Sequence, residues 1–417
     1  MNKTDLKAIL IDQNNRKEQE DLVIRELFSK VESYIKNDFV IIISGIRRCG
    51  KSTLLGQIRK KYSGYYLNFD DERLINFKVE DFQVLEELFI ELYGEKNIFY
   101  FDEIQNIPMW ERFVRRLHDQ RKKVFITGSN ASMLSKELGT HLTGRYLMLQ
   151  MFPFSFKEFL QLNKFELNKE SLFLMSSKAK IKNYFKDYFI NGGFPEYLKE
   201  LNVDYLKTLY ENIVYRDILV RYKIPNEKSL KELVYLAINS ISKEISFNSI
   251  KKTLSIGNST TVKNYFDYFE NSFLIFLISK FDYSLKKQIY NNKKVFCIDN
   301  GLAKHIGFRV TDDNGQLLEN LVFIELKRRR KEIYYYSDNK ECDFLIKNET
   351  SDIKEAIQVC YELTRENKER ETEGLIETMT KFKLKTGLIL TYDQDEEIEL
   401  KKFKIIIKSV WKWLLEN

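Results

Sequence analysis

Two glycines, a lysine and a serine stand at a characteristic spacing near residue 50. The stretch GIRRCGKST begins at Gly45, and its first eight residues fit the pattern Gly-x-x-x-x-Gly-Lys-Ser/Thr. Such glycines let the backbone curl so that its N–H groups point at phosphate oxygens. Lys51 would reach the β- and γ-phosphates, and the Ser52 hydroxyl would be a Mg²⁺ ligand. The pattern predicts a nucleotide phosphate site built by Gly45, Ile46, Arg47, Arg48, Cys49, Gly50, Lys51, Ser52 and Thr53.

An acidic pair closes a second apolar run. The sequence NIFYFDE, residues 97–103, ends in Asp102 and Glu103. At the carboxyl end of a strand, Asp102 would hold Mg²⁺ directly or through water, and Glu103 would polarise an attacking water. The pair could also simply cap the next helix, but the phosphate pattern upstream favours the first interpretation.

Polar residues follow a third apolar run, KVFIT at residues 123–127. Asn130 or Ser129 would be placed to orient the water between the carboxylates and the γ-phosphate, although a plain turn is the alternative. Arg145 precedes the next run and would stabilise transition-state charge, either on its own chain or on a neighbouring one. The sequence does not decide between action in cis and in trans, and a surface salt bridge is the alternative for Arg145.

A further set of candidate residues lies in the C-terminal third. An expected helix with Glu319 and a strand with Asp343 precede a strand that reads Gln358-Val359-Cys360. This order resembles the core of PD-(D/E)XK nucleases, whose sites need carboxylates for a metal and a lysine two residues beyond the last acid. Gln358 is a poor metal ligand and Cys360 cannot supply the lysine charge. We therefore expect a nuclease-like fold without nuclease activity, and whether Glu319 and Asp343 bind a metal stays open.

The N-terminal candidates need a parallel sheet to bring them together. Residues 39–44, FVIIIS, form a continuous β-branched run that is typical of a strand buried on both faces. Residues 97–103, 123–127 and 146–151 supply further strands. The LLGQIRKKY that follows Thr53 continues as a helix whose N-terminal dipole favours an anion. We expect an α/β core.

The pattern changes after Phe154. Apolar residues recur three and four apart to about residue 224, which predicts helices, and Gly192 and Gly193 interrupt them as a turn would. Residues 229–285 give three helical pieces and then strand-like residues, an order that suits a DNA-reading winged helix. Charge argues against DNA, because the third helix carries Asp267 and Glu270 and the segment is nearly neutral. Protein packing is the alternative.

Two charged runs have structural and functional interpretations. Tyr215-Arg216-Asp217 would suit nucleotide sensing, but helix packing with a salt bridge is the more economical account. The basic run at residues 327–331 ends the expected Glu319 helix. Cations there satisfy the helix dipole, and contact with a phosphate backbone is the second interpretation.

Composition sets the outer limits. The 417 residues carry 68 basic and 61 acidic side chains, a net charge of +7, which permits nucleic-acid contact without arguing for it. The four cysteines show no metal-ligand or disulfide spacing, and no apolar run approaches the length of a bilayer span. We expect a cytoplasmic protein that does not contact the membrane.

The ordered motifs together resemble a prokaryotic family of AAA+-type ATPases with a C-terminal domain of unknown function. The motifs that carry this resemblance are GIRRCGKST, YLNFDDERL, FDEIQNIPMWERFVRRL, ITGSN, LTGRY, FPFSFKEF, NGGFPEYL and IVYRDIL. The resemblance implies ATP and Mg²⁺ as ligands, Asp102 for the metal, Glu103 as catalytic base and Asn130 or Ser129 as sensor. Arg47 and Arg48 stand where the family has basic residues, with nucleotide or partner contact and solvated loop charge both open.

The resemblance also implies a domain order. We expect a RecA-like P-loop ATPase core at 1–152, a helical lid at 153–228, a winged-helix-like segment at 229–285 and a restriction-endonuclease-like domain at 286–417. The leading hypothesis is a Mg²⁺-dependent ATPase whose nucleotide cycle moves the C-terminal domains against a partner, in a homo-oligomer if Arg145 acts in trans. The alternatives are an ATP-gated DNA-binding module or nuclease, and an interaction switch that turns ATP over slowly.

Overall fold

The computed structural model describes residues 1–15, 23–130, 142–307, 313–348, 352–400 and 402–416. The chain divides into two compact units. Unit 1 contains Met1–Phe152 with Asn271–Phe273, and unit 2 contains Pro153–Glu270 with Leu274–Asn417. The helices in the described ranges include none that is both long and apolar enough to span a membrane.

Unit 1 is built on a five-stranded parallel sheet in the order β2-β3-β4-β1-β5. Its elements are α1 (Lys3–Asn15), α2 (Leu27–Ser33), β1 (Val40–Gly45), α3 (Lys51–Lys61), β2 (Tyr65–Asn68), η1 (Glu72–Leu74), α4 (Asp81–Tyr93), β3 (Ile98–Asp102), η2 (Ile104–Asn106), α5 (Trp110–Asp119), β4 (Lys123–Gly128) and β5 (Tyr146–Met151). The strands predicted from the apolar runs are all present. The mixed α/β fold with a parallel sheet is therefore confirmed.

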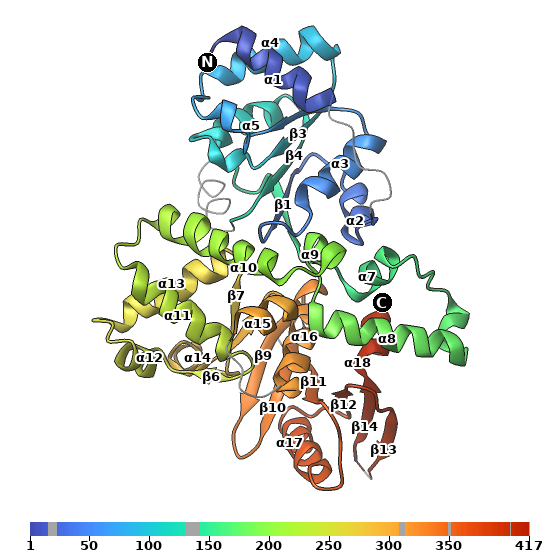
Figure 1. Cartoon of the computed structure of the whole chain (residues 1–417). Coiled ribbons are helices and arrows are strands. Elements are labelled where there is room, and N and C mark those ends of the chain that lie inside the picture. Colours follow the sequence, from blue (N-terminus) through green and yellow to red (C-terminus); the bar gives the residue numbers. More distant parts are fainter. Residues whose placement is uncertain (16–22, 131–141, 308–312, 349–351, 401, 417) are drawn as a thin grey trace. The chain divides into compact units, whose positions relative to one another are not determined.

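Helices cover both faces of this sheet (Figure 1). Alternate residues of β1, Val40 and Ile42, pack into the core that α1, α4 and α5 share on one face. Ile41 and Ile43 are also fully buried and point to the opposite face, because successive strand side chains alternate. Burial on both faces explains the continuous apolar run in the sequence.

The sheet order positions the candidate site. β4 lies between β1 and β3, so the segments after these three strands meet at one sheet edge. The P-loop follows β1, the acidic pair ends β3, and Ser129 follows β4. Carboxyl edges of parallel sheets are the usual place for ligand sites.

The first part of unit 2 is mostly helical. Its elements are α7 (Phe156–Leu162), η3 (Lys169–Leu172), α8 (Met175–Asn191), α9 (Pro195–Glu200), α10 (Val203–Asn212), the π-helix η4 (Ile213–Val220), α11 (Glu227–Asn239), β6 (Glu244–Ile245), α12 (Phe247–Thr253), α13 (Ser259–Asn271), β7 (Ile275–Ser279), α14 (Leu285–Tyr290) and β8 (Lys293–Cys297). β6, β8 and β7 form a small sheet in that order. The expected helices are present, and α8 ends just before Gly192.

The rest of unit 2 is a second α/β layer. Its elements are α15 (Asn300–Ile306), α16 (Asn314–Arg328), β9 (Glu332–Ser337), β10 (Glu341–Lys347), β11 (Ile353–Cys360), α17 (Lys368–Lys381), β12 (Thr386–Thr391), β13 (Glu396–Glu399), β14 (Lys404–Ser409) and α18 (Val410–Leu415). The six strands follow the order β13-β14-β12-β11-β10-β9. Glu319 lies on α16 and Asp343 on β10, as the sequence predicted.

The basic run at the end of α16 is used inside unit 2. Arg329 bonds to the Glu325 carboxylate at 2.8 Å and to the backbone oxygen of Trp413 at 2.7 Å. Arg328 also pairs with Glu325, and Lys331 pairs with Glu355. These contacts favour the structural interpretation of the run over binding to a phosphate backbone.

Candidate nucleotide site

The P-loop glycines occupy positions that other residues would not fit. A Cβ on Gly45 would lie 2.2 Å from the backbone oxygen of Met151 on the neighbouring strand β5. Gly50 has φ +99°, in the left-handed region, and precedes the first residue of α3. Arg25 supports the loop from behind, donating from Nη1 to the Cys49 oxygen at 2.5 Å and from Nη2 to the Phe152 oxygen at 2.7 Å. The Arg25 side chain therefore stabilises the P-loop through a hydrogen bond to its backbone.

Lys51 points into the loop. Its Nζ donates to the backbone oxygens of Gly45 and Ile46 at 3.1 and 3.2 Å and lies 3.3 Å from Glu103 Oε1. Burial alone would lower the pKa of this ammonium, but the charges of Glu103, Cys49 and Asp102 raise it above the ordinary value. Lys51 is thus a fixed cation between the loop and the acidic pair.

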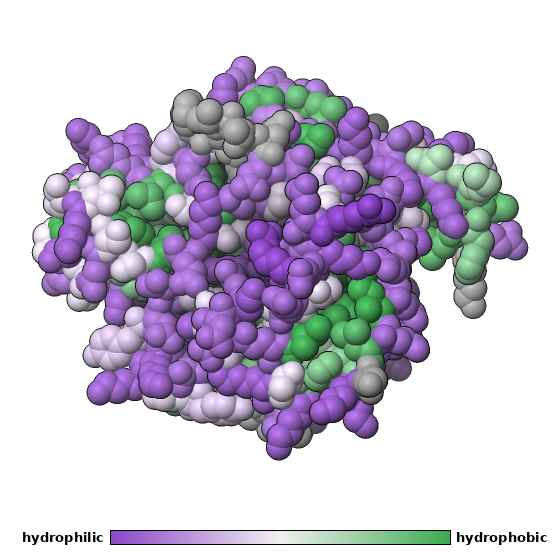
Figure 2. Space-filling model, turned by 90° about the horizontal axis from the view of Figure 1, so that it is seen from below, coloured by the Kyte–Doolittle hydropathy of each residue, from purple (hydrophilic) through white to green (hydrophobic). Residues whose placement is uncertain are grey.

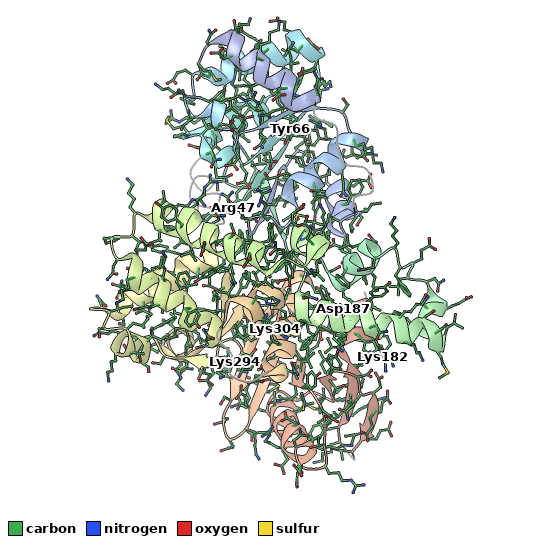
Figure 3. The ribbon with its side chains drawn as sticks, in the orientation of Figure 1. Arg47, Tyr66, Lys182, Asp187, Lys294 and Lys304 are labelled. Carbon is green, nitrogen blue, oxygen red and sulfur yellow. The ribbon has the colours of Figure 1, made fainter. Side chains whose placement is uncertain are left out.

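Asp102 is buried at the end of β3. Thr127 on β4 donates its hydroxyl to Oδ1, and Tyr66 on β2, labelled in Figure 3, donates to Oδ2 at 3.4 Å. Burial and the neighbouring charge of Glu103 raise the pKa of Asp102, while hydrogen bonds from Ser52 and Thr127 oppose the rise. The bond from Ser52 brings together the two residues predicted to share a Mg²⁺ ion.

Glu103 is held in place by several donors. Its backbone has φ 52°, and its N–H donates to Thr127 Oγ1 at 3.0 Å. The side-chain Oε2 accepts from Gln105 Nε2 and from the Ser129 N–H, the latter at 3.2 Å. Burial alone would raise its pKa, but the charge of Lys51 and the bond from Gln105 lower it. Glu103 is therefore a carboxylate at neutral pH.

Several buried polar atoms at this edge have no hydrogen-bond partner in the described parts of the chain. They include Ser44 Oγ at the end of β1, Ser129 Oγ after β4, Gln105 Oε1 after β3 and Nε2 of Gln150, which pairs with Ser44 from β5. Leaving such atoms unpaired is costly, and they are usually satisfied by a ligand or water. A polyphosphate with its Mg²⁺ and water would supply partners at this edge, so the residues present fit these groups.

The other predicted P-loop residues differ in how far their side chains are buried. Ile46 and Cys49 are fully buried, and burial raises the pKa of the Cys49 thiol. Arg47, labelled in Figure 3, is half-buried with Nη1 3.9 Å from Asp70 Oδ2. Arg48 and Ser52 are exposed, and Thr53 is half-buried. The two arginines of the loop therefore differ in exposure.

Asn130 and Arg145 lie in different places. Asn130 is fully buried directly after β4, near the edge that carries Glu103. Arg145 precedes β5, and its backbone oxygen accepts from the N–H of Val40 at the start of β1. It therefore lies at the amino edge of the sheet, about 20 Å of strand away from the P-loop. There it pairs with Asp119 at 3.1 Å. Action of Arg145 in cis does not fit this position, because the guanidinium would have to span the sheet.

The carboxylates of unit 2 surround a lysine. Lys294 Nζ lies 2.9 Å from Glu319, 3.0 Å from Asp343 and 2.6 Å from Glu341, and its side chain is only 2% exposed (Figure 3). Burial raises the pKa of Glu319 to about 8, and Lys294 opposes the rise. The described residues contain no cluster of three or more His, Cys, Asp or Glu side chains that could hold a metal.

Strand β11, which carries Gln358 and Cys360, adds no ligand to this cluster. Gln358 accepts from the Asp343 N–H at 3.3 Å and donates to Glu371 at 2.8 Å, so both ends of its amide are engaged. Cys360 is buried and bonds to the backbone oxygen of Glu362. The lysine of the cluster, Lys294, comes from β8.

Sequence reasoning missed several residues around these sites. Arg25, Thr127 and Lys294 show no local signal, because their partners are distant in the chain. Gln105 did carry a signal, since a glutamine two residues after an acidic pair can fold back onto it. Its position within FDEIQ was visible, and its contact with Glu103 was not.

Comparisons with known proteins agree with the N-terminal motifs. The model of an AAA domain matches residues 37–160, and a domain of unknown function, DUF8612, matches residues 182–313. The uncharacterized protein MJ1544 of Methanocaldococcus jannaschii is 37% identical over 396 residues, covering 90% of this chain and 88% of that protein. An uncharacterized protein of Haemophilus influenzae is 31% identical over 397 residues, covering 91% and 95%.

Solved structures give a weaker likeness. The ADP form of the Aeropyrum pernix ORC2 protein is 12% identical and covers 63% of this chain and 89% of its own, with a TM-score of 0.34. A TM-score this low supports no conclusion about fold or function.

Proposed function

The chain belongs to the family of MJ1544 and carries an AAA domain, and we propose that it binds ATP with Mg²⁺ and hydrolyses it. The observation that carries this proposal is the meeting of Lys51, Asp102 and Glu103 at one sheet edge, beside several buried polar atoms that lack partners within the described structure. An ordinary strand-turn-helix has no need of such an arrangement.

Each residue has a physical role in this proposal. The P-loop N–H groups hold the phosphates, and Lys51 exchanges the backbone oxygens of Gly45 and Ile46 for phosphate oxygens. Ser52 and Asp102 hold Mg²⁺, which neutralises charge on the phosphates when bound. Glu103 accepts a proton from the attacking water.

Asn130 and Arg145 extend the site. Asn130, or Ser129 beside it, orients the water. We propose that Arg145 acts in trans on the nucleotide of a second copy, because its own P-loop lies at the other sheet edge. The nucleotide cycle would then move the C-terminal domains against a partner.

Magnesium-dependent ATP hydrolysis by the purified chain tests the proposal. Glu103→Gln should lower turnover by about 100-fold or more while ATP still binds, because the proposed base is removed and the P-loop that holds the phosphates is kept. The exposed Glu95→Gln serves as matched control and should leave turnover unchanged. Tight ATP binding without turnover in the wild type would reject the ATPase and leave the slow switch.

The nuclease alternative has a specific observation against it. Lys294 donates to the same carboxylates that a nuclease would use for its metal, and Glu319 and Asp343 are themselves buried. A metal would have to displace this ammonium. We therefore propose that the nuclease-like domain has no metal-dependent nuclease activity.

DNA binding is the second candidate function, and the segment between β7 and β8 favours it. Helix α14 buries no residue, and Tyr283, Leu285, Ile289 and Tyr290 are 61–81% exposed beside Lys286 and Lys287. Apolar and aromatic side chains interleaved with lysines suit nucleic-acid surfaces.

In the view of Figure 2, hydrophilic side chains predominate and hydrophobic ones gather in separate patches. Salt-dependent affinity for duplex DNA that weakens in Tyr290→Ala would support this candidate, and no affinity at low salt would reject it.

A further inference from the structure

Gln105 is a buried polar residue next to the proposed base. It lies in η2, two residues after Glu103, and is 4% exposed. Glutamine is seldom fully buried, because its amide must keep hydrogen-bond partners there. Its Nε2 donates to Glu103 Oε2, but its Oε1 has no partner in the described ranges. The amide nitrogen of Gln105 is thus engaged by Glu103, whereas its oxygen is available to accept a hydrogen bond from a ligand or water.

The two oxygens of Glu103 have different partners. Oε2 is fixed by Gln105 and by the Ser129 N–H, whereas Oε1 faces Lys51 at 3.3 Å. When Lys51 engages phosphate oxygens, Glu103 Oε1 becomes a free acceptor. Gln105 Oε1 belongs to the amide that already bonds to the same carboxylate through Nε2, so both unengaged oxygens come from one hydrogen-bonded pair of side chains.

We propose that Gln105 positions the attacking water. Its Nε2 fixes the Glu103 carboxylate, and its Oε1 accepts one hydrogen of the water while Glu103 Oε1 accepts the other. The water oxygen then bonds to the γ-phosphorus, the bond from that phosphorus to the β,γ-bridging oxygen breaks, and one water proton passes to Glu103. ADP and phosphate are the products. This inference rests on the proposed ATPase function, in which a water must be oriented for in-line attack.

The variant Gln105→Met tests this role, because methionine fills a similar volume without the amide. We expect its turnover to fall by about 30-fold or more while its affinity for a fluorescent ATP analogue stays within about twofold of wild type. A second readout is the binding of Mg²⁺-ADP in the presence of aluminium fluoride, which mimics the γ-phosphoryl group in attack. Wild type should bind ADP more tightly with the fluoride, and Gln105→Met should lose that gain. The exposed Gln83→Met is the matched control and should behave as wild type in both assays.

The outcomes separate this inference from the proposed function. Normal turnover and fluoride-enhanced binding in Gln105→Met would overturn the inference and leave the ATPase intact. An equal loss of ATP affinity and thermal stability would also overturn it, because Gln105 would then only support the fold. If wild type itself shows no turnover, the proposed function fails first and the inference fails with it.

Discussion

Lys294 is a buried lysine of unit 2 that contacts three carboxyl groups. Its ammonium contacts Glu319, Asp343 and Glu341, so removing it leaves the two buried carboxyl groups, Glu319 and Asp343, without their cation. We predict that Lys294→Met lowers the free energy of unfolding by about 3–5 kcal/mol in metal-free buffer, measured by urea denaturation. Excess Mn²⁺ should restore part of this loss in the variant and should not stabilise wild type at the same site.

The control for this prediction is Lys286→Met on the exposed helix α14. A surface substitution of this kind should change stability by less than about 0.5 kcal/mol. If Lys294→Met is as stable as the control, the carboxylates do not depend on the lysine, and the argument that it stands in the place of a metal is wrong.

At the residue scale, the sequence predicted what is contiguous. The P-loop residues carry their chemistry in their spacing, and Asp102 and Glu103 are adjacent. Lys294 could not be found in this way, because it lies 49 residues from Asp343 and on a strand outside the expected nuclease core. A search for lysine on the third strand finds Cys360 instead.

At the element scale, the ends of helices and strands are harder to predict from local sequence patterns than the elements themselves. Helix α13 begins at Ser259, and the side chain of Asn258 just before it accepts from the backbone N–H of Thr260 at 2.8 Å. Arg145 was correctly placed before a strand, yet only the parallel sheet shows that this is the edge opposite the P-loop. Local patterns predict elements, and topology decides which ends meet.

Hydrogen bonds and ion pairs among several side chains connect the N-terminal helix α1 to the end of β2 and to η1. Gln13 bonds to Asp71 at 3.0 Å and to both backbone groups of Asn68, and Arg73 joins Asp71 to Asp12 at 2.8 Å. Hydrogen bonds from Arg73 hold the pKa of Asp71 well below its usual range, with Gln13 adding to the effect and burial opposing it. Because the unfolded chain then binds more protons, this stabilisation is complete above about pH 4 and is lost as the pH falls through the folded pKa.

We predict that Asp71→Asn lowers stability at pH 6 and flattens its dependence on pH below about 4. Urea midpoints between pH 2.5 and 6 measure both effects, with exposed Asp204→Asn as control. Parallel pH curves for Asp71→Asn and wild type would contradict the prediction.

Asp299 joins two segments of unit 2. Its carboxylate accepts from the Gly193 N–H at 2.6 Å and from the Leu302 N–H at 3.0 Å, which connects the turn after α8 to the start of α15. We predict that Asp299→Ala costs about 1–3 kcal/mol, because buried N–H groups lose their acceptor. Asp204→Ala should cost far less in the same denaturation assay, and equal losses would count against this connection.

At the scale of the whole molecule, the chain forms two compact units, whereas the sequence predicted four successive regions. The regions 153–228, 229–285 and 286–417 all fall within unit 2 apart from Asn271–Phe273, and their status as separate domains stays a prediction. The winged-helix and endonuclease-like assignments also stay predictions. The order of helices and strands follows from local periodicity. Assignment to a fold depends on how these elements pack together, and that packing cannot be read from local sequence patterns.

The division into units gives a thermodynamic prediction. Since the P-loop and the acidic pair lie in unit 1, a ligand bound there stabilises that unit by mass action, by about 2.7 kcal/mol at a hundred times its Kd. We predict two calorimetric transitions, of which Mg²⁺-ATP raises only one. Lys51→Ala should abolish the shift, because the ammonium proposed to contact the phosphates is gone. Lys60→Ala, an exposed residue on the same helix, should retain it. A shift of both transitions together, or one that persists in Lys51→Ala, would mean that the nucleotide does not bind through the P-loop of unit 1 alone.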